Sequence, residues 1–389
     1  MSFSLNLFKS RFLLQLVALK VFGTLFAVFI YSRFTSLGDS ERYLSAELDF
    51  SVKALTNRTH LTELFFALQT QIFPDIIASL IPSVILGYVI YYVFFMQYKY
   101  LEKKIFWTCI LLPHFVVWSS AAGKEVIAIT AFMLVVKSCV DIALYNRPKP
   151  AQTLIGLLVG LLMRPHYFIP YFFLLISTYL SHNIKMGKFA KLSLGLWLVS
   201  LGGFLGLCAV VLTGTYKYWI DFLDYVMYMS KAYFLAFDAG SNRWDISWSA
   251  LPDFFKNLWW GMPASIIGPT IAESLKRPIF LPILMEGLLS FYLIFYLLLR
   301  LLKLSKKEAQ YRAIIIFCFV PALILAFTIH YPFGLFNPGS AVRYKQSLTP
   351  LFYFYPLLLI AESKRKKNFQ VFNNNLIRPP GYRDQFPCS

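Results

Sequence analysis

Long runs of apolar residues, repeated along the whole chain, constrain its fold more than any other feature. A helix needs roughly 20 such residues to cross the hydrocarbon core of a membrane. Ten runs approach that length, at about 12–31, 76–96, 105–119, 126–145, 152–163, 167–181, 192–212, 280–302, 313–331 and 348–361. Because lipid offers no partner to backbone polar groups, such runs predict helices. The chain is therefore expected to be an all-α, polytopic membrane protein with about ten transmembrane helices.

The composition excludes the common soluble classes. Of the 389 residues, 58% are hydrophobic and only 14% are charged, whereas soluble domains carry about 25% charged residues. This excludes a soluble globular enzyme, a disordered protein and a small disulfide scaffold. The net charge of +18 comes without zinc-ligand spacing or a basic stripe outside the loops, so nucleic acid is not an expected partner. Basic loops in a membrane protein instead serve topology and contact anionic lipid headgroups.

The distribution of Lys and Arg predicts the orientation. The short loops on one side of the predicted spans, together with the two ends of the chain, carry 21 of these residues, and the much longer opposite loops carry 14. The positive-inside rule then places both termini in the cytoplasm of a cell with an inner membrane. Residues 1–363 form one multi-span domain, which begins with an uncleaved signal-anchor helix. Residues 364–389 form a flexible basic cytoplasmic tail.

Two long loops lie on the predicted outer side, at about 32–75 and 213–279. The second is rich in aromatic residues, which suit helices lying in the headgroup zone. Its tryptophans are Trp219, Trp244, Trp248, Trp259 and Trp260.

Polar residues gather at the predicted outer ends of the spans, first in the sequence GDSERY at 38–43. Here Asp39 and Glu41 are candidate general bases, and a carboxylate at this place could also hold a divalent cation or a sugar hydroxyl. The alternative is that Asp39 or Ser40 caps a short outer helix. The two roles of Asp39 are compatible.

A second group lies where the third span ends and the fourth begins. Lys124 and Glu125 open the fourth span, either as an ordinary interfacial pair with a snorkeling lysine, or with Lys124 and the helix N-terminus meeting a lipid phosphate. One turn deeper than Trp118, His114 lies inside the third span, where a hydrogen bond within the bundle is the commoner role of a lone histidine and a functional role the rarer one.

Two arginines complete the pattern. Arg164 and His166 lie in a tight reversal between two short spans, where Arg164 serves as a structural ion pair or as an anion clamp. Arg343 and Tyr344 lead into the last span, where the arginine either anchors the interface or binds a phosphate through its planar fork. One acidic and three basic groups at the outer ends of the spans would match an anionic amphiphile in the outer leaflet.

The chain resembles bacterial multi-span proteins of surface-polysaccharide assembly, the GT-C-type glycosyltransferases and O-antigen-polymerase-like proteins. The resemblance rests on GDSERYL at 38–44, on LPHFVVWSSAAGKEVIAITAFML at 112–134, on RPH at 164–166 and on Arg343, Tyr344 and Pro350. These pieces cover a tenth to a fifth of the chain. No adjacent pair of acids and no Asp-x-Asp follows the first span, which is a departure from the group.

The resemblance implies transfer of a sugar or oligosaccharide from a polyprenyl phosphate or diphosphate donor to a glycan acceptor at the periplasmic face. Asp39, with Glu41, would supply the base. Lys124, Arg164, His166 and Arg343 would bind the donor phosphate, supported by His114, Glu125 and Tyr344. The resemblance implies no definite cofactor, and a divalent metal, if one binds, is expected on Asp39. The rival hypotheses are a flippase for lipid-linked oligosaccharide and a non-catalytic subunit of an assembly complex.

Overall fold

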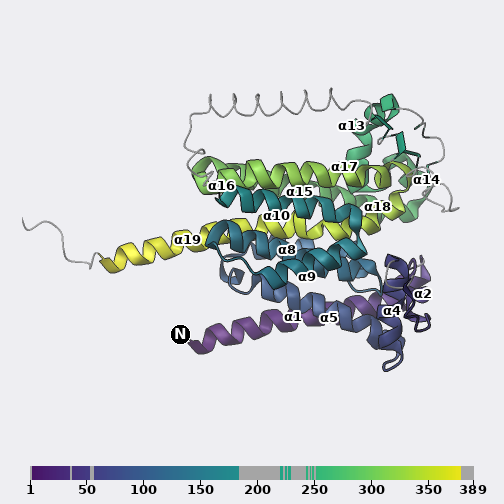
Figure 1. The fold of residues 1–389 in the computed structure, drawn as a ribbon, viewed down its shortest axis with the longest axis horizontal. Helices are drawn as coiled ribbons and strands as arrows, with labels where there is room; N and C mark the ends of the chain where they lie inside the picture. The colour runs from purple at the N-terminus through teal and green to yellow at the C-terminus, as the bar shows by residue number, and fades with distance from the viewer. Residues whose placement is uncertain are drawn as a thin grey trace, which may run out of the picture.

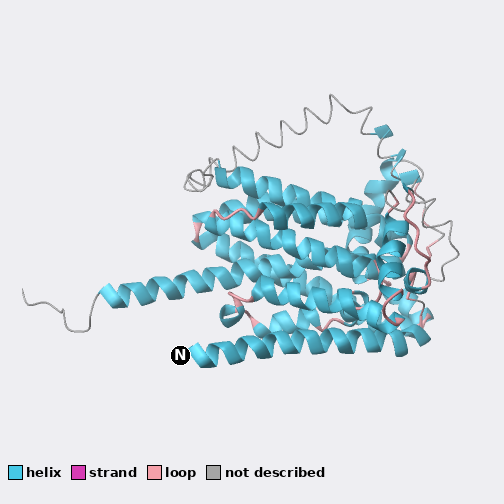
Figure 2. Ribbon diagram, turned by 60° about the horizontal axis from the view of Figure 1, so that its bottom comes forward, coloured by secondary structure: helices cyan, strands magenta, loops and turns pink. Residues whose placement is uncertain are grey.

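The structure, a computed structural model, describes residues 2–35, 37–52, 57–183 and 251–377, together with a few positions between 220 and 248. Over these residues the fold is built from helices and loops, with no strand (Figure 2). The prediction of an all-α protein is confirmed. Most of the long helices run side by side in one bundle (Figure 1).

Helix α8 (Lys124–Tyr145) lies at the centre of this bundle and is buried along most of its length. It packs against α5, α9, α10 and α19. Other long helices of the described residues close the bundle around it. They are α1 (Ser2–Phe29), α5 (Asp75–Phe94), α9 (Pro150–Met163), α10 (Pro165–Asn183), α13 (Leu251–Ile267), α15 (Leu281–Lys307), α17 (Val320–Phe336) and α19 (Tyr355–Ile377).

Five helices are long and apolar enough to cross a membrane, judged by length and composition: 11–33, 75–94, 124–145, 278–307 and 309–336. Each coincides with a predicted span. Helix α9 is apolar but shorter, and matches the predicted span 152–163. The predicted span 192–212 lies outside the described residues. The chain therefore has the helices of an all-α membrane protein.

The predicted span 105–119 is not one helix. Helix α6 (Lys103–Ile110) and helix α7 (Pro113–Trp118) are separated at Leu111 and Leu112. Proline lacks a backbone N–H and disfavours a helical conformation in the residue before it, so Pro113 explains the break. The prediction of a flexible tail from Lys364 is also wrong over its first part, because α19 continues to Ile377. Residues 364–377 contain no proline or glycine, and their Lys and Arg are good helix formers.

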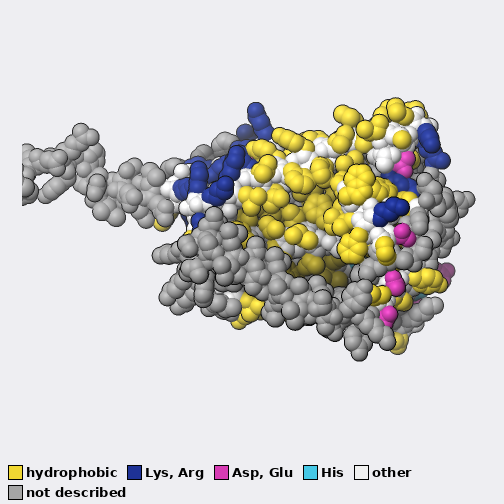
Figure 3. All heavy atoms as spheres, turned by 90° about the horizontal axis from the view of Figure 1, so that it is seen from above, with side chains coloured by type: hydrophobic (Ala, Val, Ile, Leu, Met, Phe, Trp, Pro, Cys, Tyr) yellow, Lys and Arg dark blue, Asp and Glu magenta, His cyan; other side chains and the backbone are white. Residues whose placement is uncertain are grey.

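The two ends of the bundle differ. The start of α1 and the end of α19 lie at one end, which we call the terminal end (Figure 1). The opposite end, which we call the loop end, carries five short elements and α13: α2 (Ser40–Leu44), α4 (Arg58–Thr70), α14 (Ile271–Lys276), the 3-10 turn Pro278–Phe280 and α18 (Pro338–Tyr344). On the face drawn in Figure 3, hydrophobic side chains cover the middle, Lys and Arg lie toward both ends, and Asp and Glu lie toward the loop end.

The aromatic segment between α10 and α15 contributes to the bundle. Helix α13 packs on α17 and α15 and lies across their ends (Figure 1). Trp248 is buried against Tyr331 and Phe336, whereas Trp259 on α13 is 79% exposed. Trp219 and Trp244 lie outside the described residues. This segment therefore both covers the loop end and presents aromatic side chains outward.

Candidate functional site

Two of the arginines singled out from the sequence, Arg164 and Arg343, converge at the loop end on one buried carboxylate, Glu125. Its side chain is 1% exposed and accepts hydrogen bonds from two arginines. Arg343 donates from Nε at 2.6 Å and from Nη2 at 3.4 Å, and Arg164 donates from Nη2. The two arginine side chains are 14% and 5% exposed. Glu125 lies 39 residues from Arg164 along the sequence, and the fold brings the two together.

Aromatic rings fix the arginines from the sides. The guanidinium carbon of Arg164 lies 4.4 Å from the centre of the Tyr344 ring. That of Arg343 lies 4.9 Å from the Trp118 ring and 5.5 Å from the Tyr344 ring. Cations over aromatic faces are attracted by the ring quadrupole, most strongly where water is excluded. Tyr344, predicted as a supporting residue, thus lies against both arginines.

Asp39 lies at the edge of this group and is the accessible carboxylate. Its side chain is 44% exposed, and Oδ2 lies 3.8 Å from Arg343 Nη2. Tyr43 donates its hydroxyl to Asp39 at 3.2 Å. Burial and the charge of Asp39 raise the pKa of Tyr43, so this hydroxyl stays protonated and remains a donor.

The prediction that Asp39 caps a short outer helix is confirmed for its position, but the capping hydrogen bond is not formed. Asp39 occupies the N-cap of α2 but makes no side-chain cap hydrogen bond. Ser40 bonds the carbonyl groups of Leu37 and Ala122, at 2.8 Å and 2.6 Å, and so ties α2 to the start of α8. Glu41, the second candidate base, is exposed on α2, and the structure does not bring it to Glu125.

Gly38 makes room for Arg343. Its backbone has a φ of +63°, in the left-handed region, and a Cβ atom at this position would collide with the guanidinium group of Arg343. Glycine adopts such a conformation without strain and leaves the space open. The glycine before Asp39 is therefore part of the geometry of the site.

Lys124 does not form an interfacial pair with its neighbour. It is 7% exposed and donates to Thr59 Oγ1 on α4 at 2.6 Å, and its ammonium group lies 5.8 Å from the Tyr43 ring centre. The snorkeling interpretation is therefore wrong. We call Asp39, Lys124, Glu125, Arg164 and Arg343 the Glu125 cluster; it holds three cationic and two anionic groups.

Two buried nitrogen atoms in and beside the Glu125 cluster have no hydrogen-bond partner among the described residues: Arg164 Nε and His166 Nε2. The His166 ring packs on Tyr167 and Phe333, with centroids 4.2 Å and 5.4 Å apart. Buried polar atoms are nearly always paired in folded proteins. Unpaired nitrogens beside a surplus of positive charge suit an anionic ligand that supplies oxygen acceptors.

His114 lies in a different polar group, and the bundle hydrogen bond predicted for it is confirmed. Its Nδ1 lies 2.6 Å from Glu286 on α15, and its backbone N–H lies 3.1 Å from both oxygens of that carboxylate. Glu286 thus satisfies a backbone donor at the start of α7, where the helix breaks. Sequence reasoning missed Glu286; an acid in the middle of an apolar run was the signal that could have found it.

His330 lies deeper on α17, between Tyr167 and the backbone of α13. Its Nδ1 lies 2.6 Å from the Tyr167 hydroxyl, and its Nε2 lies 3.1 Å from the Ser265 carbonyl oxygen. Close by in sequence to Arg343, Lys345 donates to the Ile266 carbonyl at 2.7 Å, and burial lowers its pKa to about 8. These contacts fix α13 against the elements that carry the arginines.

A metal ligand set does not form around Asp39. Within the described parts of the chain, no three His, Cys, Asp or Glu side chains come together as a metal site would require. Cys109, Cys139 and Cys318 are buried as free thiols. The Glu125 cluster offers a carboxylate at the surface, Asp39, and buried cations behind it.

Comparison of the chain with protein-family models, with curated proteins and with solved structures finds no match in any of the three.

Proposed function

We propose that the chain is a glycosyltransferase or polysaccharide polymerase of the inner membrane, with its site at the periplasmic face. It transfers a sugar or oligosaccharide from a polyprenyl phosphate or diphosphate donor to a glycan acceptor. The observation that carries the proposal is the surplus of buried positive charge in the Glu125 cluster, next to the accessible carboxylate of Asp39.

In this proposal the acceptor hydroxyl gives its proton to Asp39 while its oxygen bonds to the anomeric carbon of the donor sugar. The bond from that carbon to the phosphate oxygen breaks, and the phosphate leaves with the electron pair. Arg164, Arg343 and Lys124 stabilise the negative charge of the leaving group. Glu125 acts through the arginines as a positioning residue, because it is buried and shared between them.

The proposed topology has about ten spans, with both termini in the cytoplasm and the 213–279 loop in the periplasm. Impermeant thiol labelling of intact cells tests it, on a chain whose five cysteines are replaced. Ser45→Cys, in an exposed position after α2, should react, and Lys307→Cys, exposed at the end of α15, should not. The opposite pattern would put the Glu125 cluster in the cytoplasm and exclude the proposed site.

The direct test is a transfer assay with purified protein and polyprenyl diphosphate-linked oligosaccharide. Asp39→Asn should lower turnover by about 10²–10⁴-fold, the usual contribution of a general base. Glu41→Gln, two residues away and exposed, is the matched control and should retain activity. If Asp39→Asn retains full activity, as Glu41→Gln is expected to do, Asp39 is not the base.

The arginines are tested in the same assay. Arg164→Ala and Arg343→Ala should each abolish product, and the lysine variants should restore only part of it because the planar fork is lost. Arg33→Ala, an exposed arginine at the end of the first span, is the control at the same end of the bundle. Full activity of both alanine variants would contradict the phosphate-binding role.

One observation favours the second candidate, a flippase for lipid-linked oligosaccharide. Discontinuous helices with polar groups at the break mark the binding sites of many transporters. The break between α6 and α7, with Glu286 against it, has this form. Movement of a fluorescent lipid-linked oligosaccharide across proteoliposomes, with no change in its covalent structure, would favour the flippase over the transferase.

A further inference from the structure

A groove opens on the flank of the bundle between α9 and α10. The tight link at Arg164 joins these helices at the loop end, and the groove lies nearer the terminal end. Its volume is about 550 Å³. It is lined by Ile142, Pro148, Pro150, Ala151, Thr153, Leu154, Leu157, Leu175, Ile176, Tyr179 and Leu180. Apart from Thr153 and Tyr179, these side chains are entirely apolar.

The groove is part of a wider apolar flank. On α9, Leu154 is 57% and Leu158 is 51% exposed, and on α10, Ile169 is 49% and Phe172 is 40% exposed. In water such a flank would mark an interaction site. In a chain with several helices of membrane-spanning length, hydrocarbon is the medium that such a flank contacts. A groove in such an apolar flank suits the acyl chain of a lipid.

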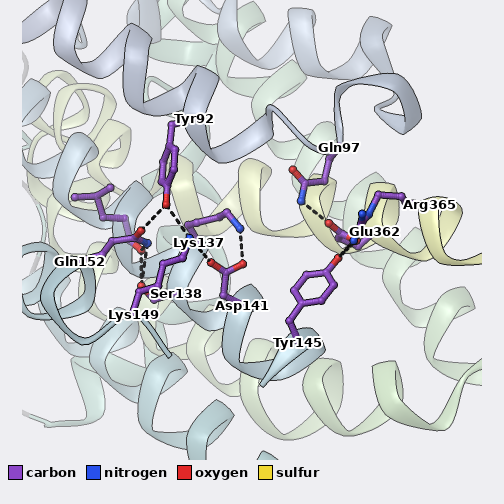
Figure 4. A network of polar contacts seen from close by, with 11 residues as sticks. Tyr92, Gln97, Lys137, Ser138, Asp141, Tyr145, Lys149, Gln152, Glu362 and Arg365 are labelled. Carbon is purple, nitrogen blue, oxygen red and sulfur yellow. Dashed lines mark hydrogen bonds and ion pairs between the residues drawn. The ribbon is translucent and has the colours of Figure 1, made fainter. Parts of the chain in front are cut away.

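Basic residues lie at the end of the groove formed by Pro148 and Pro150. Lys149 donates to the Tyr92 hydroxyl at 2.9 Å and lies 3.2 Å from Asp141 Oδ2 (Figure 4). The hydrogen bond to Tyr92, together with the charge of Asp141, raises the pKa of Lys149, although burial opposes this. Its side chain is still 43% exposed. Arg147 is exposed beside it.

Among the residues that the structure describes, the charges around this end are not balanced. Asp141 also pairs with Lys137, so one carboxylate faces two lysines, and Arg147 adds a third cation. The aligned hydrogen bonds from Lys149 to Tyr92 and from Tyr92 to Gln152 Oε1, the latter at 2.8 Å, hold the lysine at the mouth of the groove (Figure 4). The site thus combines an apolar groove with a fixed positive end.

We propose that this groove binds one acyl chain of an anionic phospholipid from the leaflet at the terminal end, with the lipid phosphate against Arg147 and Lys149. Burial of acyl methylenes in the groove supplies affinity, and the cations select an anionic headgroup over a zwitterionic one. The groove is distinct from the Glu125 cluster, which lies at the opposite end of the bundle. Lipid binding in the groove does not depend on the proposed transfer reaction.

Photocrosslinking in nanodiscs tests the proposal. The probe is phosphatidylglycerol carrying a diazirine in one acyl chain, and phosphatidylcholine with the same chain is the comparison. Peptide mass spectrometry should find crosslinks concentrated on residues 150–157 and 175–180, several-fold more with phosphatidylglycerol. Arg147→Gln should reduce the preference about fivefold, since a basic residue at an anionic surface contributes about 1 kcal/mol.

Two matched variants separate the groove from the general lipid surface. Ala151→Trp places a ring in the groove at an exposed position and should remove most crosslinks there. Leu158→Trp changes an exposed residue of the same helix outside the groove and should leave them unchanged. Equal labelling by the two lipids, or crosslinks spread evenly to Ile169 and Phe172, would overturn the proposal. Gel-filtration elution and the melting temperature show which variants are folded. If Ala151→Trp does not fold, the Arg147→Gln result decides on its own.

Discussion

The two ends of the bundle each bury a glutamate, and they satisfy it in different ways. At the terminal end Glu362 accepts hydrogen bonds from Gln97, Tyr145 and Arg365, in a group that we call the Glu362 cluster (Figure 4). Its one arginine is 30% exposed. At the loop end Glu125 is held by two arginines, with Lys124 and Asp39 nearby.

The difference lies in charge balance. Neutral donors supply two of the partners of Glu362, so the Glu362 cluster is close to neutral and its arginine can reach water. The Glu125 cluster has an extra cation and almost no exposure for its arginines. Burial of unbalanced charge is unfavourable and is commonly found where a protein binds or transforms a charged ligand. The comparison supports the proposal that the Glu125 cluster binds an anion, whereas the charges of the Glu362 cluster are already balanced by its own residues.

The largest expected effect is on stability, when Glu125 and Glu362 are each replaced by glutamine in separate variants. Glu125→Gln leaves buried Arg164 without a counter-charge and Arg343 with only the Asp39 carboxylate at 3.8 Å, which should cost about 3–5 kcal/mol. Glu362→Gln leaves one half-exposed arginine that can turn to water, and should cost about 1–3 kcal/mol. Thermal unfolding in detergent measures both. A larger loss for Glu362→Gln would reverse the comparison.

Gly38→Ala tests the space in which Arg343 lies. The new Cβ meets the guanidinium group and the backbone has a positive φ, so we expect a cost of about 2 kcal/mol and loss of transfer activity. Ser45→Ala, in the exposed position after α2, is the control. Normal activity of Gly38→Ala would show that Arg343 can move without consequence.

Added anion should distinguish the clusters directly. Pyrophosphate at about ten times its Kd for the Glu125 cluster should stabilise the protein by roughly 1.4 kcal/mol, raising the apparent melting temperature by a few degrees. The shift should vanish in Arg343→Ala and persist in Arg365→Ala. If both variants lose it, or neither does, the binding is not at the Glu125 cluster.

The smallest effect is a dependence on pH at a third glutamate, Glu273, which pairs with one arginine at the loop end. Arg243 donates to it at 2.5 Å and 2.7 Å, and the Thr270 N–H donates at 2.7 Å. Although burial alone would raise the pKa of Glu273, these bonds lower it.

A carboxylate with a lowered pKa stabilises the fold above its ordinary pKa of about 4.3, and the contribution is lost as the pH falls through the lowered value. Below about pH 4 the wild type should lose up to about 1 kcal/mol more than Glu273→Gln, consistent with a partly exposed pair. Melting curves from pH 6 to 3 would reveal it. Parallel loss in both proteins would mean that other carboxylates control acid unfolding.

The sequence determined the kind of protein and the position of most of its site residues along the helices. Apolar runs of spanning length predicted α1, α5, α8, α15 and α17, because lipid leaves the backbone no alternative to internal hydrogen bonds. The break at Pro113 follows from its missing N–H, yet the length of the apolar run masked it. Polar residues at the ends of these runs pointed to Asp39, Lys124, Arg164 and Arg343.

Only the tertiary structure decided which of these residues meet. Glu125 binds arginines 39 and 218 residues away along the chain, and His114 binds Glu286, 172 residues away. Periodicity within a helix fixes the side of the helix on which a residue lies, but not which other helix packs against that side. Glu125 thus looked like a supporting residue beside Lys124, and became the centre of the site because α8 lies at the core of the bundle, where the link at Arg164 and the helix that carries Arg343 both reach it.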